Sequence, residues 1–387
     1  MTYNIRADRG ASHHEYLQRT SPPGVLQGKG RFAEDGELAD PDLAAGNKIP
    51  AAVAAMRRAI QTIKNQEIPV SDCIGWLLIG NYLFLFLEGN METVFKGVGT
   101  AIVTPMDAQG NVDYEAFARL IDWQVASGVN AIIVAGTTGE GSTLSDEEHC
   151  QHIKYCVDKV GGRIPVVAGT GSNDTDYAIH LTKFACEAGA DAMLLVTPYY
   201  NKATQRGLIE SFTAIADAST KPCILYNVPS RTGCNLLPKT ALALSEHPMI
   251  TGIKEASGNI SQIAELMSLV QGKMDVYSGN DDQIVPILAL GGAGVISVLS
   301  NVVPKQTVAI CDSFFAGDIA KSRKLQLSLL PLINALFCEV NPIPVKAATA
   351  AMGYGQNKLR LPLTSMEKAN EEHLLALMRE AGVAFGG

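Results

Sequence analysis

The sequence places a lysine inside an apolar stretch, where a charged side chain is costly. Lys254 lies in GIKEAS at 252–257. An ammonium buried there either pairs with a carboxylate, such as that of Glu255, or loses its proton. A lysine considered alone more often forms the ion pair. A neutral amine, in contrast, attacks a ketone to form an imine, which then accepts electrons from the neighbouring carbon.

Other polar groups follow apolar stretches of the same kind. They are GTTGE at 136–140, PYYN at 198–201, and YN at 226–227, which leads into PSRTG at 229–233. If these stretches are the strands of one parallel barrel, the polar groups meet Lys254 at one end of it. That arrangement favours imine chemistry over a structural ion pair.

Each of these groups has a chemical and a purely structural interpretation. The hydroxyls of Thr137 and Thr138 suit a carboxylate, although Thr-Gly turns are also common in loops. Tyr226 can transfer protons at an imine, or it can be a buried tyrosine with a bonded hydroxyl. Arg231 can bind a second carboxylate through two hydrogen bonds, or it can be a solvated loop residue. The tyrosines at 199–200 fit ordinary loop packing equally well.

The elements that must position these groups are eight short apolar runs. They lie at 97–105, 130–136, 164–171, 192–198, 222–229, 249–257, 275–280 and 294–301. Near-continuous apolar strands indicate a parallel sheet covered on both faces, and helix-length segments such as 113–128 separate the runs. The pattern predicts an α/β fold, a (β/α)8 TIM barrel. A doubly wound open sheet is the alternative, but no G-x-G-x-x-G follows the first run.

The pattern also predicts how the chain is divided. We expect the catalytic barrel at 95–318 and a C-terminal helical region at 319–387. Helical patterns occur at 305–316, 318–337, 342–352 and 367–382. We expect this helical region to serve oligomer packing.

Residues 1–94 differ from the rest and predict a poorly ordered extension with a short helix at 50–65. The 14-residue apolar run at 74–87 is too short to span a bilayer comfortably. Glu88-Gly89 must be encoded by purine-rich codons shortly before Met91, which resembles a translated ribosome-binding site. We therefore hypothesise that Met91 is the native start, which N-terminal peptide mapping would test.

Composition excludes several classes of function. The 387 residues carry a net charge of −8, which gives no electrostatic footprint for nucleic acid or an anionic membrane. Eight cysteines without a C-x-x-C pair are typical of reduced thiols, and their spacing with histidine predicts no metal site. We expect a cytoplasmic protein.

Several long motifs occur in a fixed order from Phe95 onward: GTTGEG, VTPYYNKATQ, LYNVPSRTG, GIKEASGN, YSGND and NPIPVKAA. Together they resemble the pyruvate-dependent Schiff-base lyase family that includes N-acetylneuraminate lyase and dihydrodipicolinate synthase. The resemblance is closest to the synthase branch, because the sugar-acid lyases lack an arginine at the position of Arg231. It implies condensation of pyruvate with aspartate semialdehyde, without a metal or an organic cofactor.

The resemblance also implies a role for individual residues. Lys254 would form the Schiff base, and Thr137 and Thr138 would bind the pyruvate carboxylate with help from the backbone of Gly279 and Ile296. Further roles would fall to the remaining motif residues: a proton relay of Thr138, Tyr226 and Tyr200, and an aldehyde-carboxylate site at Arg231. The relay's Tyr200 would reach into the neighbouring subunit's site, so a homo-oligomer is expected, with a dimer of dimers implied.

Many such synthases are inhibited by lysine at a subunit interface. The matching positions are Ser142, His149, Asn173, Tyr177 and Tyr199. Position 177 is often a glutamate in lysine-sensitive members, where its charge would bind the inhibitor's amine. Tyrosine lacks that charge, so the sequence predicts weak feedback inhibition or none.

Three other interpretations remain open. A lyase for a sugar-derived keto acid would turn over pyruvate with a sugar aldehyde. A non-catalytic pyruvate-binding barrel would bind without turnover, although every relay position carries the family's residue type. Membrane attachment through 74–87 would change location more than chemistry.

Overall fold

A computed structural model describes residues 93–386. The expectations for the extension, the helix at 50–65, the apolar run at 74–87 and a start at Met91 fall outside the described residues. The predicted barrel and the C-terminal helices lie within them.

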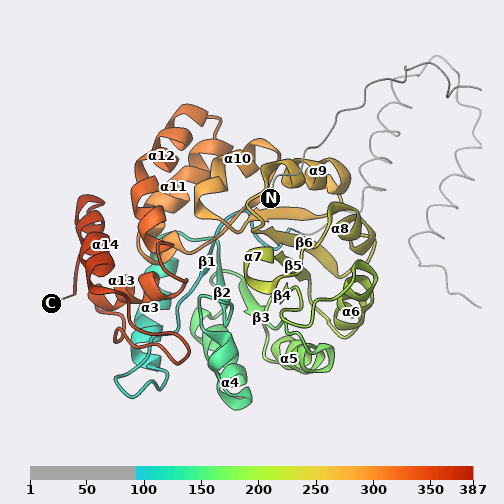
Figure 1. The fold of residues 1–387 in the computed structure, drawn as a ribbon, viewed down its shortest axis with the longest axis horizontal. Helices are drawn as coiled ribbons and strands as arrows, with labels where there is room; N and C mark the ends of the chain where they lie inside the picture. The colour runs from blue at the N-terminus through green and yellow to red at the C-terminus, as the bar shows by residue number, and fades with distance from the viewer. Residues whose placement is uncertain (1–92, 387) are drawn as a thin grey trace, which may run out of the picture. The chain divides into compact units, whose positions relative to one another are not determined.

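Eight parallel strands close into a barrel in chain order, which confirms the predicted TIM barrel (Figure 1). The strands are β1 (Gly97–Ala101), β2 (Ala131–Val134), β3 (Val166–Gly169), β4 (Ala192–Val196), β5 (Cys223–Asn227), β6 (Ile250–Glu255), β7 (Asp275–Ser278) and β8 (Gly294–Ser297). Each lies within one of the eight apolar runs. The ring closes where β8 pairs with β1, and there a Cβ at Gly294 would lie 1.9 Å from the carbonyl oxygen of Gly97. Only glycine fits this closure.

Helices cover the outside of the barrel. They are α3 (Tyr114–Ala126), α4 (Asp146–Val160), α5 (Thr175–Glu187), α6 (Gln205–Asp217), α8 (Pro238–Leu244), α9 (Ile260–Val270), α10 (Ile284–Ala289) and α11 (Pro304–Phe315). Local sequence explains their starts: Ser145 and Glu148 form a reciprocal capping box at α4, for example. On α3 the fully buried face includes Phe117, Leu120 and Ile121, at the spacing of an amphipathic helix.

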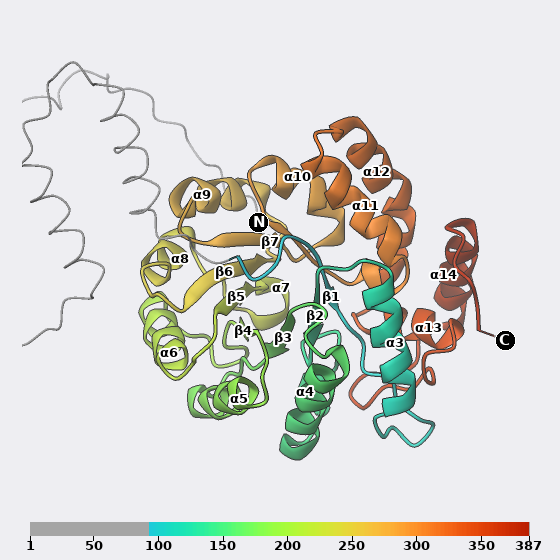
Figure 2. The same ribbon diagram turned by 180° about the vertical axis from the view of Figure 1, so that it is seen from behind.

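Three more helices follow the barrel: α12 (Ile319–Leu336), α13 (Ile343–Ala351) and α14 (Lys368–Glu380). They begin and end close to the predicted helical patterns. In both ribbon views α13 and α14 lie on the side of the barrel that carries α3 (Figures 1 and 2). The ring of Trp123 on α3 lies 5.5 Å from that of Tyr354, just after α13. The segment just after α13 therefore packs against α3 of the first βα unit.

Side chains fill the barrel interior, so the barrel is a core and not a pore. Ile133, Ile224 and Ile296 are among the apolar residues that point inward. Phe95, just before β1, stacks on Tyr277 of β7 with ring centroids 4.4 Å apart, and the Tyr277 hydroxyl donates to the Phe95 carbonyl at 2.7 Å. This stack covers the N-terminal end of the barrel and leaves the opposite end for chemistry.

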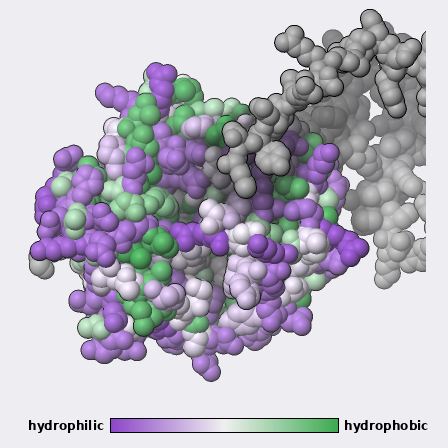
Figure 3. All heavy atoms as spheres, viewed as in Figure 1, coloured by the Kyte–Doolittle hydropathy of each residue, from purple (hydrophilic) through white to green (hydrophobic). Residues whose placement is uncertain are grey.

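The surface drawn in Figure 3 is mostly hydrophilic, with hydrophobic residues in scattered areas between polar ones. Among residues 93–386, every helix is too short or too polar to cross a membrane. The exposed large apolar side chains include Leu361, Leu327 and Val340. Of the described large apolar residues Tyr200 is outstanding in its exposure, at 90%.

Candidate active site

Lys254 and Tyr226 are direct neighbours across β6 and β5. Side chains at paired positions of adjacent strands project to the same face, and here that face is the barrel interior. The Lys254 amine lies 4.2 Å from the centroid of the Tyr226 ring, and the two residues are only 5% and 6% exposed. No carboxylate among residues 93–386 lies within ion-pair distance of this amine.

The alternative partner of Lys254 is occupied elsewhere. Adjacent residues of a strand point to opposite faces, so Glu255 projects away from the barrel interior. Its carboxylate accepts from the side-chain amide of Asn227 at 3.0 Å and from the Ser257 N–H at 2.7 Å. Burial raises the pKa of Glu255, while the hydrogen bonds from Ser257 and Asn227 oppose that rise. The structural interpretation of Lys254 as the partner of Glu255 is therefore not supported.

A second buried carboxylate lies behind the site. Asp281 follows β7 and accepts from the backbone N–H groups of Val298 at 3.0 Å and Leu299 at 2.9 Å. Burial raises its pKa, and the positive charge of Lys254 is among the smaller effects that lower it. Asp281 thus holds the turn after β8 through these two hydrogen bonds, and it is close enough to Lys254 for the two charges to interact.

Gly279 leaves room beside the lysine. A Cβ at this position would lie 2.6 Å from the Ala256 Cβ and 3.1 Å from Cε of Lys254. Any other residue would displace the lysine or the chain. Its N–H donates to the Glu255 carbonyl at 2.8 Å, and Ile296 of β8 is fully buried. Of these two predicted binding positions, Ile296 lies within β8 and Gly279 directly follows β7.

Thr137 and Thr138 differ in their surroundings. Thr138 is 3% exposed, and its hydroxyl accepts from the side-chain amide of Asn341 at 3.0 Å. Thr137 is exposed and lines a cavity instead. Asn341 is absent from the predicted site residues, although it lies in the NPIPVKAA motif, because its partner is 203 residues away in the sequence.

One cavity of about 600 Å³ joins both predicted sets of residues. From the substrate set its wall includes Thr137, Tyr226 and Arg231. From the inhibitor set it includes Ser142, His149, Tyr177 and Tyr199. Arg231 lies on α7 (Pro229–Thr232), a single turn directly after β5. A ligand in this cavity can therefore reach from the Tyr226 ring to the inhibitor set.

Tyr200 is not brought to the other relay residues within this chain. Its φ of +73° is uncommon for a residue other than glycine, and its side chain is almost fully exposed. In the described part of the chain, no hydrogen bond joins the hydroxyls of Thr138, Tyr226 and Tyr200. The relay stays a prediction, and a non-glycine residue held at positive φ is a reason to look for a function at this position.

The inhibitor set contains a contact that the sequence did not predict. The Tyr177 hydroxyl donates to Asp146 at 2.7 Å. Burial and this carboxylate raise the pKa of Tyr177. His149 bonds the Gly169 carbonyl through Nε2 at 2.9 Å, and burial lowers its pKa. Asn173 does not line the cavity; its carbonyl accepts from Asn201 at 2.8 Å.

The described residues offer no site for a bound metal. Between residues 93 and 386, no three His, Cys, Asp or Glu side chains gather as a ligand set. The polar groups of the cavity are hydroxyls, the His149 imidazole, one guanidinium and one carboxylate beside Tyr177. This arrangement suits a small anionic organic molecule.

Comparison with known proteins identifies the family of the chain. The model of the dihydrodipicolinate synthetase family matches residues 94–381. The 4-hydroxy-tetrahydrodipicolinate synthase of Lachnoclostridium phytofermentans is 55% identical over 291 residues, which are 75% of this chain and 99% of the relative. That of Caldicellulosiruptor bescii is 53% identical over 292 residues, 76% of this chain and 99% of the relative. The crystal structure of the Acinetobacter baumannii dihydrodipicolinate synthase complexed with pyruvate superposes with a TM-score of 0.74 at 46% identity, covering 76% of this chain and all (100%) of that one.

Proposed function

The chain belongs to the dihydrodipicolinate synthetase family, and from this premise we propose how its residues carry out the reaction of a 4-hydroxy-tetrahydrodipicolinate synthase. The enzyme is a lyase of lysine and diaminopimelate biosynthesis. It condenses pyruvate with L-aspartate 4-semialdehyde through a lysine Schiff base. The residue roles that follow are the proposal.

Lys254 is the nucleophile. Its amine, unpaired with any described carboxylate, attacks C2 of pyruvate, and loss of water gives the imine. Loss of a proton from C3 converts the imine into an enamine. The observation that carries this assignment is the placement of Lys254 against Tyr226 inside the barrel, because one residue supplies the amine and the other a hydroxyl.

The carboxylate of pyruvate is bound by the threonine loop. Because the Thr138 hydroxyl accepts from Asn341, its own proton is available to donate to the carboxylate. Thr137 donates from the cavity wall, and the backbone at Gly279 and Ile296 completes the site. These contacts hold pyruvate with C2 toward Lys254.

Protons move through Tyr226, with Thr138 and a tyrosine of a neighbouring subunit. The 90% exposure of Tyr200 supports a role in a second copy of the chain. The active form is then a homo-oligomer, and we propose a dimer of dimers in the cytoplasm. The substrates are the only partners that the reaction requires.

Arg231 binds the carboxylate of aspartate semialdehyde through paired hydrogen bonds. The enamine carbon attacks the aldehyde and forms the new carbon–carbon bond. The amine of the same substrate then adds to the imine carbon and expels the Lys254 amine, which closes the ring. Every proton and leaving group is supplied by the substrates and these side chains, so no cofactor takes part.

An aldehyde panel tests this assignment. The purified protein is assayed with pyruvate plus aspartate semialdehyde, N-acetylmannosamine or glyceraldehyde, alongside Lys254→Ala and Arg231→Ala. We expect turnover with aspartate semialdehyde alone, lost in both variants. Turnover with a sugar aldehyde that survives Arg231→Ala would retain the Schiff base but contradict the role of Arg231.

A further inference from the structure

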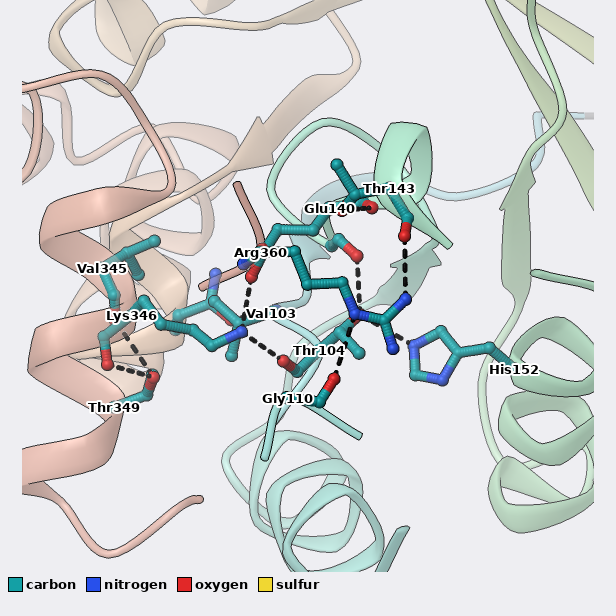
Figure 4. Close-up of polar contacts among 12 residues, drawn as sticks. Val103, Thr104, Gly110, Glu140, Thr143, His152, Val345, Lys346, Thr349 and Arg360 are labelled. Carbon is teal, nitrogen blue, oxygen red and sulfur yellow. Dashed lines mark hydrogen bonds and ion pairs between the residues drawn. The ribbon is translucent and has the colours of Figure 1, made fainter. Parts of the chain in front are cut away.

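A second buried lysine lies outside the reaction described so far. Lys346 of α13 donates to Oε1 of Glu140 at 2.5 Å and to the Thr104 carbonyl at 2.6 Å (Figure 4). Both charged side chains are only 1% exposed. A buried ion pair is rarely more stable than well-packed apolar residues of the same volume. The pair therefore needs an explanation beyond stability.

Glu140 belongs to the loop that carries the two threonines. Its φ of +53° is left-handed, and its N–H donates to the Thr137 carbonyl at 3.1 Å. The Thr104 hydroxyl donates to the Gly139 carbonyl at 2.7 Å from the other side. A residue in this strained conformation persists only when its surroundings hold it. The ion pair between the Glu140 carboxylate and Lys346 is one of the contacts that keep Glu140 in this conformation.

The same C-terminal stretch contacts the loop at two more points. Asn341 binds the Thr138 hydroxyl, and the Arg360 N–H donates to Oε2 of Glu140 at 3.2 Å. The Arg360 guanidinium also binds the Thr143 carbonyl at 2.8 Å (Figure 4). It binds both oxygens of Glu148 as well, at 2.6 Å. Residues of segment 341–360 thus bind the threonine loop itself and also the residues that follow it.

Glu140 is the charged group that pairs with Lys346, because Thr104 and His152 beside it are neutral. The Thr104 hydroxyl donates to Gly139, so it accepts from Nε2 of His152 at 3.0 Å, and Nε2 carries the ring proton. Burial lowers the pKa of His152 to about 3, so the ring is neutral. Burial also lowers the pKa of Lys346, and Glu140 opposes that shift. The carboxylate is the nearest partner that stabilises the ammonium.

We propose that Lys346 is a positioning residue for pyruvate: through Glu140 it fixes the loop that presents Thr137 and Thr138 to the substrate carboxylate. This inference rests on the proposed function, because it assumes that the threonines bind pyruvate. Lys346 touches no substrate. Its loss therefore weakens pyruvate binding more than it changes the aldehyde site, which contains Arg231 on α7, directly after β5.

Trapping of the imine by borohydride measures pyruvate binding without the aldehyde. In Lys346→Met we expect the pyruvate concentration for half-maximal trapping to rise roughly tenfold, as a misplaced binding group produces. The KM for aspartate semialdehyde should stay within about twofold. Lys368→Met is the matched control, since Lys368 is 89% exposed and, among residues 93–386, pairs only with exposed Glu372 at 3.8 Å. It should leave both values unchanged.

A second pair of variants keeps the test independent of folding. Glu140→Gln retains the shape of the side chain, and Glu140→Gln with Lys346→Met removes both charges together. We expect both to fold, as judged by circular dichroism, and to show the raised half-saturation. An unchanged half-saturation in a folded variant, or an equal change for both substrates, would overturn the role of Lys346. Failure of the wild type to trap pyruvate would instead overturn the proposed function.

Discussion

Lys254 and Tyr226 lie side by side on β6 and β5, with the amine 4.2 Å from the centre of the ring. The face of an aromatic ring is electronegative and attracts a cation. An imine formed on Lys254 gains positive charge as it is protonated, and the ring already lies against that position. Tyr226 thus presents a ring face that suits positive charge, and we propose that its hydroxyl transfers protons.

These two contributions can be separated by Tyr226→Phe. The ring stays and the hydroxyl is lost, so imine trapping by borohydride should persist while kcat falls about 10²- to 10⁴-fold, as is usual for loss of an acid–base group. The thermal midpoint should change little, because the hydroxyl makes no hydrogen bond with residues 93–386. A variant with more than half of the wild-type kcat would exclude Tyr226 from the relay.

Mixing two inactive variants tests whether Tyr200 acts in a neighbouring subunit. Tyr200→Phe and Lys254→Ala are each expected to be nearly inactive. If tyrosine and lysine of one site come from different chains, unfolding and refolding the two together should restore about a quarter of wild-type sites. Refolding each variant alone is the control. No recovery in the mixture would mean that Tyr200 serves its own chain.

Tyr177 predicts a weak response to lysine. Its hydroxyl binds Asp146, so the position offers no carboxylate of its own to an inhibitor's amine. A lysine titration should show weak inhibition or none, and Tyr177→Glu should increase sensitivity about tenfold or more, because a hydrogen bond to a charged group is stronger. Tyr177→Phe is the control. Strong inhibition of the wild type at sub-millimolar lysine would contradict the prediction.

The Arg360–Glu148 pair predicts that part of the free energy of unfolding depends on pH in the acidic range. The Arg360 guanidinium lowers the pKa of Glu148 from 4.5 to about 2. The folded state thus favours the ionised carboxylate, and this contribution is complete above pH 4.5 and is lost as the pH falls toward 2. Arg360→Gln should lower the thermal midpoint by a few degrees near neutrality, and the difference should shrink in this acidic window.

Arg206→Gln is the matched control for that experiment, because Arg206 and Glu210 form a pair that is 88% and 71% exposed. Such pairs contribute little. A difference between wild type and Arg360→Gln that stayed constant from neutrality down to pH about 3 would show that Glu148 is not the group responsible.

The local sequence pattern was sufficient to predict the barrel. Each strand is an apolar run, and such a run can be recognised without knowing which distant residues it contacts. The pattern also puts Lys254 and Tyr226 on consecutive strands, which the structure pairs, while their roles in the reaction stay predictions. It could not predict that Asn341 binds Thr138 or that Lys346 binds Glu140, because those partners are 203 and 206 residues apart. It also could not predict the bond from Tyr177 to Asp146, which depends on how α4 and α5 pack.

The contacts of Lys346 also have a consequence for the order of events during synthesis on the ribosome. All eight strands, including the one that bears Lys254, emerge before residues 341–360 do. The nucleophile is therefore in place on a nascent barrel whose threonine loop still lacks Asn341, Lys346 and Arg360. If Lys346 positions the threonine loop as we propose, full affinity for pyruvate arises late, when the C-terminal helices dock.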